Sequence, residues 1–311
     1  MKYSYLFGPV HSRRLGISLG IDLVPSKTCS LDCVYCECGR TTALVLERGE
    51  YADSAKIIDE LTHYLSTKPS LDHITFGGSG EPTLNTGTGR IVRFLKESYP
   101  QYKCALLTNG TLLYLPQVRE EVLPFDIVLP SLDAVSDAVF AKVNRPHGKL
   151  ENNAVIKGLI EFRKSYKGLV WLEVFIVPGI NDTPEELALF KKAITEINPD
   201  RVQLNSLDRP GTCGWVRPAS MEKLQEIAGF FSPLPVEIIS RQAKNSPLPQ
   251  AAERASDSIL AMVARRPSTI EEIATLAGLT INEADRILSA LVSSHRIEKQ
   301  VTGNRSFYRM V

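Results

Sequence analysis

The sequence has no excess of charge of either sign. Its 311 residues include 36 Lys and Arg against 35 Asp and Glu, which gives a formal net charge of +1 at pH 7. A chain that binds nucleic acid or an anionic membrane through its overall field needs a large charge of one sign. Any contact of this chain with RNA therefore has to come from a local patch.

Long apolar segments are missing as well. No run of 18 apolar residues occurs, so no membrane span is expected. The first 14 residues, MKYSYLFGPVHSRR, do not show the charged and then apolar pattern of a signal segment. Internal repeats and low-complexity segments are also absent. We therefore expect a cytoplasmic protein that has no membrane partner.

Cysteine is scarce, but it is not scattered. Four of the six cysteines lie within ten residues, at positions 29, 33, 36 and 38, and the other two are Cys104 and Cys213. In a reducing compartment such a cluster is more typical of a metal site than of disulfides. This pattern argues against a secreted domain held together by disulfides, and it points to one place in the sequence.

Hydrophobic periodicity predicts strands that alternate with helices along most of the chain. The predicted strands are 17–24, 73–76, 104–108, 127–131, 169–177, 201–206 and 236–240, and the predicted helices are 54–66, 91–98, 153–166, 184–197 and 221–231. This alternation favours a parallel sheet with right-handed crossovers. We predict an α/β fold in which residues 1–242 form a partial TIM-like (β/α)6 barrel.

The pattern changes after residue 242. Residues 243–255, AKNSPLPQAAERA, contain two prolines and are predicted to be a linker. Three helices at 256–266, 268–276 and 282–294, then strands at 296–301 and 306–310 around a Thr-Gly-Asn turn, predict a winged-helix domain over residues 256–311.

The predicted winged-helix domain is a poor candidate for a strong reader of DNA. Its third helix begins with Asn282, Glu283 and Asp285, which places acidic side chains where phosphates or bases would be met. Docking of a peptide or protein, or a structural cap on the barrel, fits this charge at least as well.

The cysteine cluster has a defined spacing. The sequence CSLDCVYC over residues 29–36 provides three thiols, which can hold three corners of an Fe4S4 cluster and leave the fourth iron without a protein ligand. The alternative is a structural zinc site, which needs four ligands and would have to use Cys38. The spacing CxxxCxxCxC is not usual for zinc.

This motif, just after the first predicted strand and with Tyr35 before its last cysteine, resembles the radical S-adenosylmethionine superfamily over residues 5–210. The chain is also distantly similar to the group that makes the wyosine base of tRNA. The resemblance implies an Fe4S4 cluster on Cys29, Cys33 and Cys36 and S-adenosylmethionine on the open iron. It further implies a 5′-deoxyadenosyl radical that abstracts hydrogen from a substrate, and an external one-electron donor of the flavodoxin or ferredoxin type.

Other residues at strand ends match positions that bind S-adenosylmethionine in this family. The resemblance implies contacts with its methionine, ribose or adenine for Tyr35, Gly78, Gly80, Glu81, Thr108, Asn109, Ser131, Asp133, Arg145 and Asn181. Turn formation is the alternative for the segments 78–83, 108–110 and 131–133, and a solvated loop is the alternative for Arg145. The segment 11–16, HSRRLG, resembles an element of enzymes related to the wyosine group, with a solvated basic turn as its alternative.

Alternation along two strands gives a prediction that does not depend on the resemblance. Glu173 lies opposite an aliphatic strand face, and Gln203 and Asn205 share a polar face. The outer face of a parallel barrel packs under helices, so we expect these side chains to face the lumen and to contact substrate or cofactor. Glu173 is also a candidate proton acceptor. A satisfied buried network is the alternative.

The remaining cysteines argue for one cluster. No cysteine precedes Cys29 and none follows Cys213, unlike family members that hold a second cluster. Cys213 is a candidate hydrogen donor to a radical intermediate, with an inert loop thiol as its alternative.

The identity of the substrate stays open at this point. It is a tRNA base, a peptide or protein, or a small molecule. A different class of function is an iron–sulfur redox-sensing winged-helix regulator without radical catalysis. The acidic third helix and the motifs at the strand ends argue against that class.

Overall fold

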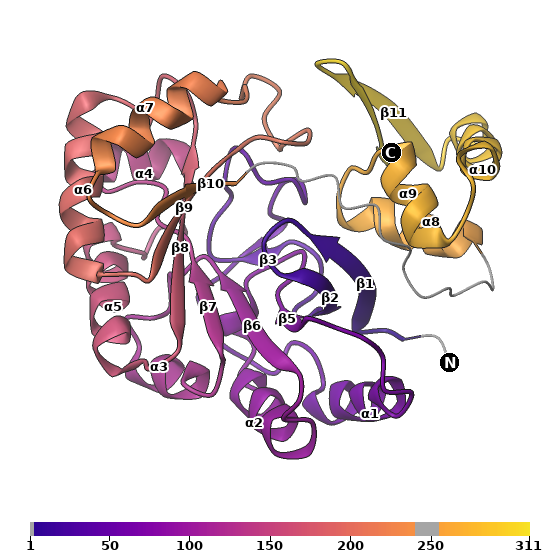
Figure 1. Ribbon diagram of the computed structural model, residues 1–311, viewed down its shortest axis with the longest axis horizontal. Coiled ribbons are helices and arrows are strands. Elements are labelled where there is room, and N and C mark those ends of the chain that lie inside the picture. Colours follow the sequence, from indigo (N-terminus) through magenta and orange to yellow (C-terminus); the bar gives the residue numbers. More distant parts are fainter. Residues whose placement is uncertain (1–2, 240–254) are drawn as a thin grey trace.

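The computed structural model describes residues 3–239 and 255–311. Its centre is an eight-stranded sheet in which the strand order runs from β1 to β10 without closing on itself (Figure 1). In spatial order the strands are β1 (Leu6–Ser12), β2 (Gly16–Ile21), β5 (His73–Phe76), β6 (Lys103–Thr108), β7 (Ile127–Pro130), β8 (Leu169–Ile176), β9 (Arg201–Ser206) and β10 (Val236–Ile238). All neighbours from β2 to β10 are parallel, which confirms the predicted α/β fold of a partial barrel.

Helices cover the outer face of this sheet (Figure 1). They are α1 (Ser54–Leu65), α2 (Thr88–Ser98), α3 (Pro116–Val122), α4 (Asp137–Val143), α5 (Asn152–Ser165), α6 (Pro184–Ile197) and α7 (Met221–Phe231). The main core forms where aliphatic strand residues such as Ile74 and Leu106 meet helix residues such as Leu61 and Phe190, all of which are at most 1% exposed. Burial of this apolar surface holds the helices on the sheet.

Local signals explain where the predicted helices begin and end. The Asp53 carboxylate accepts hydrogen bonds from the first backbone N–H groups of α1, and the Thr183 hydroxyl caps α6, which has a proline in its first turn. Asn198 ends α6 in the left-handed conformation, with φ of +53°. These elements agree with the sequence-based prediction because their caps and periodicity point to the same boundaries.

The structure contains elements that periodicity did not predict. β1 pairs antiparallel with β2, and its register shifts between Phe7 and Val10, so its residues do not alternate regularly. The helices α3 and α4 have seven residues each, which is too short for a clear helical period. The two-residue strands β3 (Thr28–Cys29) and β4 (Ala43–Leu44) pair with each other, and a 3₁₀ turn η1 spans Pro82–Leu84.

The turn between β1 and β2 packs against side chains of β6, β7 and β8. Leu15 from this turn is 2% exposed and packs with Ala105, Ile127, Leu129 and Trp171. The segment around residues 11–16 is therefore not only a solvated turn.

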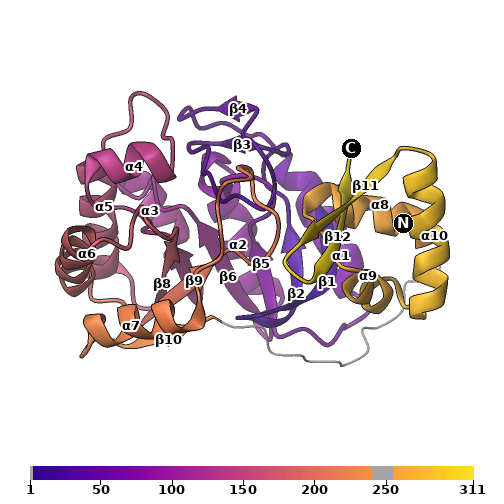
Figure 2. The same cartoon turned by 90° about the horizontal axis from the view of Figure 1, so that it is seen from above.

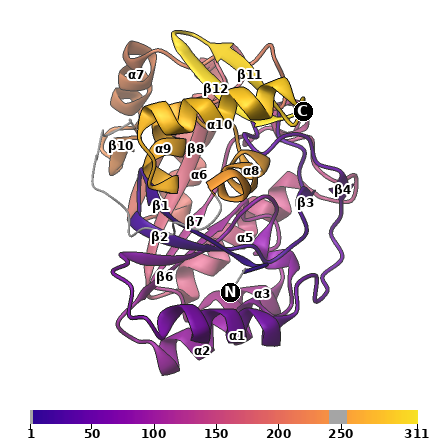
Figure 3. The same ribbon diagram turned by 90° about the vertical axis from the view of Figure 1, so that its right-hand side faces the viewer.

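The C-terminal part has a hydrophobic core of its own. It consists of α8 (Ala255–Arg265), α9 (Ile270–Ala277), α10 (Ile281–Ser293), β11 (Ile297–Thr302) and β12 (Arg305–Met310) (Figures 2 and 3). Ile259, Ile273, Leu288 and Ile297 meet in its centre. Three helices followed by an antiparallel strand pair match the expected order of elements, while the winged-helix assignment stays a prediction. The predicted linker lies outside the described residues, apart from Ala255.

The C-terminal part packs beside β1 and β2 (Figure 2). Arg265 at the end of α8 pairs with Asp22, with 2.9 Å between Nη2 and Oδ2, and its guanidinium lies 4.8 Å from the centre of the Phe7 ring. None of the helices in residues 3–239 and 255–311 combines the length and apolar character needed to cross a membrane.

Candidate functional site

The cysteine motif lies on the loop that follows β2, at the carboxyl ends of the parallel strands (Figure 2). Backbone hydrogen bonds hold this loop from both sides. Val34 N–H donates to the Val143 carbonyl at 2.9 Å, and Cys213 N–H donates to the Val34 carbonyl at 3.0 Å. Val34 is fully buried. The position of the motif after a strand follows from the sequence. The conformation of its loop is held by these contacts with residues 143 and 213.

Each of the three motif thiols has a nearby N–H donor from a side chain. Asn109 Nδ2 lies 3.4 Å from Cys29 Sγ, and Asn144 Nδ2 lies 3.4 Å from Cys33 Sγ. Lys27 Nζ lies 3.2 Å from Cys36 Sγ. Donors of this kind stabilise thiolate ligands and orient them. Lys27 and Asn144 were not among the predicted site residues. The nearness of Lys27 to Cys29 in the sequence was the available signal for it, whereas Asn144 had none that singled it out.

The protein environment acts differently on the individual thiols. Burial raises the pKa of Cys29 to about 12 and also raises the pKa of Cys33, because a buried thiolate loses its hydration. A hydrogen bond with Cys38 and the ammonium group of Lys27 lower the pKa of Cys36. Metal binding would therefore have to release protons from Cys29 and Cys33.

The other cysteines occupy different surroundings. Cys38 shares a hydrogen bond with Cys36, and its thiol lies 3.9 Å from the Gly78 carbonyl. Cys104 is buried in the main core on β6. All six cysteines are free thiols. Within the described ranges, no three Cys, His, Asp or Glu side chains converge on the position of one metal ion.

The glycine-containing segment after β5 approaches the start of the cysteine loop very closely. A Cβ atom on Gly78 would lie 1.9 Å from Asp22 Oδ1, and a Cβ on Gly80 would lie 2.3 Å from the Thr28 carbonyl oxygen. Glu81 N–H donates to the same Thr28 carbonyl at 3.1 Å. Side chains at either glycine position would force the two loops apart.

Glu81 fixes the end of β6. It is 2% exposed, and its carboxylate accepts hydrogen bonds from the Thr108 hydroxyl at 2.6 Å, from Asn109 N–H at 2.7 Å and from Thr83. Burial raises the pKa of Glu81 although these bonds favour the charged form. Three predicted site residues, Glu81, Thr108 and Asn109, are thus brought together. Their mutual hydrogen bonds give the Glu81 carboxylate a positioning role.

A second buried carboxylate organises the loop after β7. The Asp133 carboxylate accepts hydrogen bonds from the Tyr35 hydroxyl, from Asn144 Nδ2 at 3.0 Å and from Phe175 N–H at 2.9 Å. The Tyr35 ring stacks on Phe175 with 3.8 Å between ring centroids. Burial raises the pKa of Asp133 to about 6. Through these contacts Asp133 and Tyr35 hold the cysteine loop against β8.

Asn181 is also used within the protein. It is fully buried, and it accepts a hydrogen bond from Val177 N–H at 2.7 Å and donates to the carbonyls of Asp133 and Phe175. These contacts hold the turn that follows β8. Ser131 differs from these residues, since it is only partly buried at the end of β7. Its hydroxyl has no hydrogen-bond partner among the residues that the structure describes.

The polar faces of β8 and β9 meet an arginine that was not predicted as a site residue. Arg14, from the turn before β2, pairs with the Glu173 carboxylate and lies 3.4 Å from Gln203 Oε1. Asn205 Nδ2 lies 3.5 Å from Glu173 Oε2. The ion pair with Arg14 occupies the Glu173 carboxylate, which favours a binding role over proton acceptance. Two adjacent arginines in the segment 11–16 were the available sequence signal.

Arg145 and Cys213 lie next to each other beside the cysteine loop. Arg145 Nη2 lies 3.2 Å from Cys213 Sγ, and Arg145 Nη1 lies 3.7 Å from Asp32 Oδ2. Cys213 also packs with Val34 and Tyr35. Arg145 and Cys213, both predicted as site residues, come from different loops and contact each other beside the cysteine motif.

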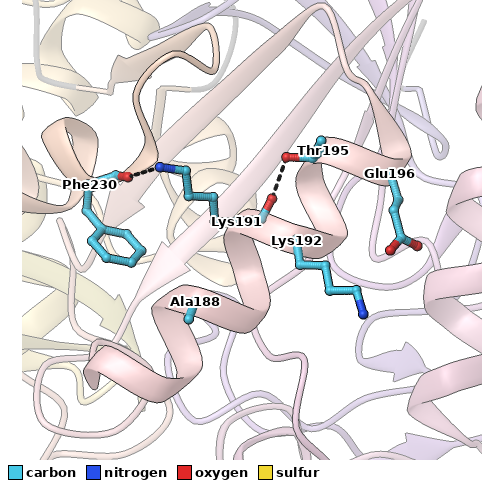
Figure 4. Close-up of a pocket in the computed structure, with 6 residues that line it drawn as sticks. All are labelled: Ala188, Lys191, Lys192, Thr195, Glu196 and Phe230. Carbon is cyan, nitrogen blue, oxygen red and sulfur yellow. Dashed lines mark hydrogen bonds between the residues drawn. The ribbon is translucent and has the colours of Figure 1, made fainter.

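A hollow of about 440 Å³ on the outer surface does not belong to this site (Figure 4). It lies between α6 and α7 and is lined by Ala188, Lys191, Lys192, Thr195, Glu196 and Phe230. Lys191 Nζ donates to the Phe230 carbonyl at 2.8 Å. None of the predicted site residues lines this hollow.

Comparison with known proteins gives one family and several relatives. Residues 23–190 match the Radical SAM superfamily. The chain is 34% identical over 306 residues to a protein named GTPase Obg from Brachyspira hyodysenteriae, covering 97% of this chain but 44% of that protein. It is 31% identical over 309 residues to a UPF0026 protein from Methanocaldococcus jannaschii, covering 97% of this chain and 94% of the relative. The sequence contains no GxxxxGK[ST] motif, the usual phosphate-binding loop of a GTPase.

Solved structures resemble the barrel. A radical SAM methyltransferase from Sphaerobacter thermophilus has a TM-score of 0.55 at 18% identity, covering 71% of this chain and 66% of that chain. TYW1 with a lysine-pyruvate adduct bound has a TM-score of 0.51 at 16% identity, covering 69% of this chain and 72% of that chain. At these identities the similarity concerns the fold.

Proposed function

The chain belongs to the radical SAM superfamily, and on that premise we propose that it is an enzyme that holds an Fe4S4 cluster on Cys29, Cys33 and Cys36 with S-adenosylmethionine beside it. When bound, these two groups supply a 5′-deoxyadenosyl radical that abstracts hydrogen from a substrate. The observation that carries the proposal is the arrangement of three free thiols on one loop, each with its own N–H donor. A protein scaffold of this kind orients thiolate ligands and stabilises their negative charge.

The residues around the cysteine loop have separate roles in this proposal. Gly78 and Gly80 have no side chains, so their backbone can lie close to the start of the cysteine loop. Glu81 holds the ends of two strands together, and the partly exposed Ser131 hydroxyl is available to contact a ribose or a methionine. Arg145 offers a positive charge for a carboxylate.

The lumen supports a substrate with polar groups near its reacting position. Arg14, Glu173, Gln203 and Asn205 present both donors and acceptors on one side of the barrel. A tRNA base, a peptide and a small polar molecule all have such groups. Cys213 lies beside the motif, where a thiol can donate hydrogen to a substrate radical. We further propose a cytoplasmic location and a flavodoxin- or ferredoxin-type electron donor.

The test is anaerobic reconstitution of the full chain with iron and sulfide, reduction with dithionite and addition of S-adenosylmethionine. The expected product is 5′-deoxyadenosine, measured by chromatography. The variant Cys33→Ala should lose both the cluster and the product, whereas the matched variant Cys38→Ala should keep both. An intact cluster without this product contradicts the proposal, and it favours the alternative of an iron–sulfur redox sensor.

A further inference from the structure

A buried arginine joins the C-terminal part to the barrel. Arg209 follows β9 and is 5% exposed. Its Nη1 and Nη2 atoms lie 2.5 Å and 2.6 Å from the two carboxylate oxygens of Glu272 on α9, and Nη1 also donates to the Pro267 carbonyl at 2.8 Å. A two-pronged contact of this kind fixes the orientation of the guanidinium plane.

The same guanidinium reaches the cysteine loop. Arg209 Nε lies 3.4 Å from Glu37 Oε2, and Glu37 stands between Cys36 and Cys38 in the sequence. The loop that carries Arg209 also touches the motif directly. Thr212 Oγ1 donates to the Cys36 carbonyl at 3.1 Å, and a Cβ atom on Gly211 would lie 2.8 Å from the Tyr35 carbonyl oxygen.

A second contact attaches the C-terminal part to the same loop. Arg305 at the start of β12 donates to the Asp208 carbonyl at 2.5 Å and pairs with its carboxylate at 2.9 Å. The neighbours Asp208 and Arg209 are therefore both held by the C-terminal part. This loop lies between the C-terminal part and the cysteine motif, and it contacts both.

We infer that Arg209 is a positioning residue that couples docking of the C-terminal part to the conformation of the cluster-binding cysteine loop. A buried guanidinium needs carboxylate partners, because an unpaired charge is costly at low dielectric. Loss of the Glu272 carboxylate removes the two-pronged contact and leaves the Glu37 contact in place, which shifts the attraction on the guanidinium toward the cysteine loop. A ligand that shifts the C-terminal part would change the cluster environment by the same route.

This inference rests on the proposed function only in assuming that the loop binds the cluster. The decisive variant is Glu272→Gln, because Glu272 lies on α9 and its carboxylate contacts Arg209, which in turn contacts Glu37 on the cysteine loop. The matched control is Glu298→Gln, which removes an exposed ion pair with Arg309 within the C-terminal part. Both variants remove one carboxylate charge from the same part of the chain.

The measurements are iron content, the electron paramagnetic resonance (EPR) spectrum of the reduced cluster with and without S-adenosylmethionine, and small-angle scattering. Glu272→Gln should alter the EPR spectrum and lower cluster retention by about 10-fold, the usual size of such effects from residues behind the ligands. Glu298→Gln should behave as wild type. A Glu272→Gln spectrum identical to that of the control overturns the inference.

The single variant Glu37→Gln keeps the test decisive if Glu272→Gln is poorly folded, because it should alter the EPR spectrum through the same Arg209 contact. Glu37→Gln removes the ion pair between Arg209 and the cysteine loop, and the Glu37 side chain is only partly buried. If both carboxylates act through Arg209, the effect of Glu37→Gln and Glu272→Gln together should be smaller than the sum of the single effects. Additive effects overturn the coupling. Failure of the wild-type chain to bind a cluster contradicts the proposed function instead.

Discussion

Lys27 Nζ lies 3.2 Å from Cys36 Sγ, and the backbone of Lys27 adopts a left-handed φ of +61° to place it there. This conformation is uncommon for a residue other than glycine. Burial alone would lower the pKa of Lys27, but the surrounding cysteine sulfurs, Cys36 first among them, raise it. The side chain therefore keeps a positive charge beside the motif.

Replacement of Lys27 by Met should make the reduction potential of the reconstituted cluster more negative. Reduction adds a negative charge, and the ammonium group stabilises that charge through its contact with the ligand sulfur. Cluster retention should fall by about 10-fold. A redox titration followed by EPR measures the potential. Lys56→Met, at an exposed ion pair on α1, is the control. An unchanged potential in Lys27→Met would show that this contact does not act on the cluster.

Gly78→Ala should weaken the binding of S-adenosylmethionine and destabilise the fold. The new Cβ would lie 1.9 Å from Asp22 Oδ1, so either the loop or the Asp22–Arg265 pair has to move. Overpacking of this kind costs about 1–3 kcal/mol. Urea unfolding and calorimetric titration with S-adenosylmethionine measure the two effects. Gly148→Ala, where nothing lies within 4 Å of the added Cβ, should leave both unchanged.

Replacement of Glu81 by Gln should lower the free energy of unfolding by about 1–3 kcal/mol. The Glu81 carboxylate accepts hydrogen bonds from four donors on Thr83, Thr108 and Asn109, and an amide cannot accept all of them. Urea unfolding measures the loss. The exposed Glu196→Gln on α6 serves as a control. A fully stable Glu81→Gln variant would contradict the positioning role of this carboxylate.

Arg14→Met should cost more stability than the double change Arg14→Met with Glu173→Gln. The single variant leaves the Glu173 carboxylate mostly buried without its cation, whereas the double variant removes both charges. Urea unfolding of both variants gives the comparison. Equal losses would mean that Glu173 finds enough compensation in Asn205 and solvent.

Docking of the C-terminal part should weaken in acid. Burial raises the pKa of Glu272, but the hydrogen bonds and charge of Arg209 outweigh it, and the net pKa lies below the ordinary value of 4.5. Because the folded pKa is depressed, the stabilisation is complete above pH 4.5 and is lost as the pH falls through the folded pKa. Small-angle scattering across this range should show separation in the wild type. Glu272→Gln should lack this pH-dependent component.

Much of the barrel was predictable because its signals are local. The ranges of α6, α7, β5 and β9 were predicted without error, since caps, prolines and periodicity agree at their boundaries. The predicted strand 236–240 runs past the described residues, and β10 covers Val236–Ile238. β1 was missed because its irregular register hides the alternation of a strand.

The sequence by itself determined the cysteine spacing, the order of strands and helices, and the positions of polar residues at strand ends. These properties depend on neighbours along the chain. Only the tertiary structure decided which distant side chains come into contact. Examples are Asn144 with Cys33, Arg14 with Glu173, and Arg209 with both Glu37 and Glu272. The members of each pair are more than 30 residues apart in the sequence. The packed sheet and its loops bring them together. Long-range contacts depend on the geometry of the whole partial barrel, which no local pattern encodes.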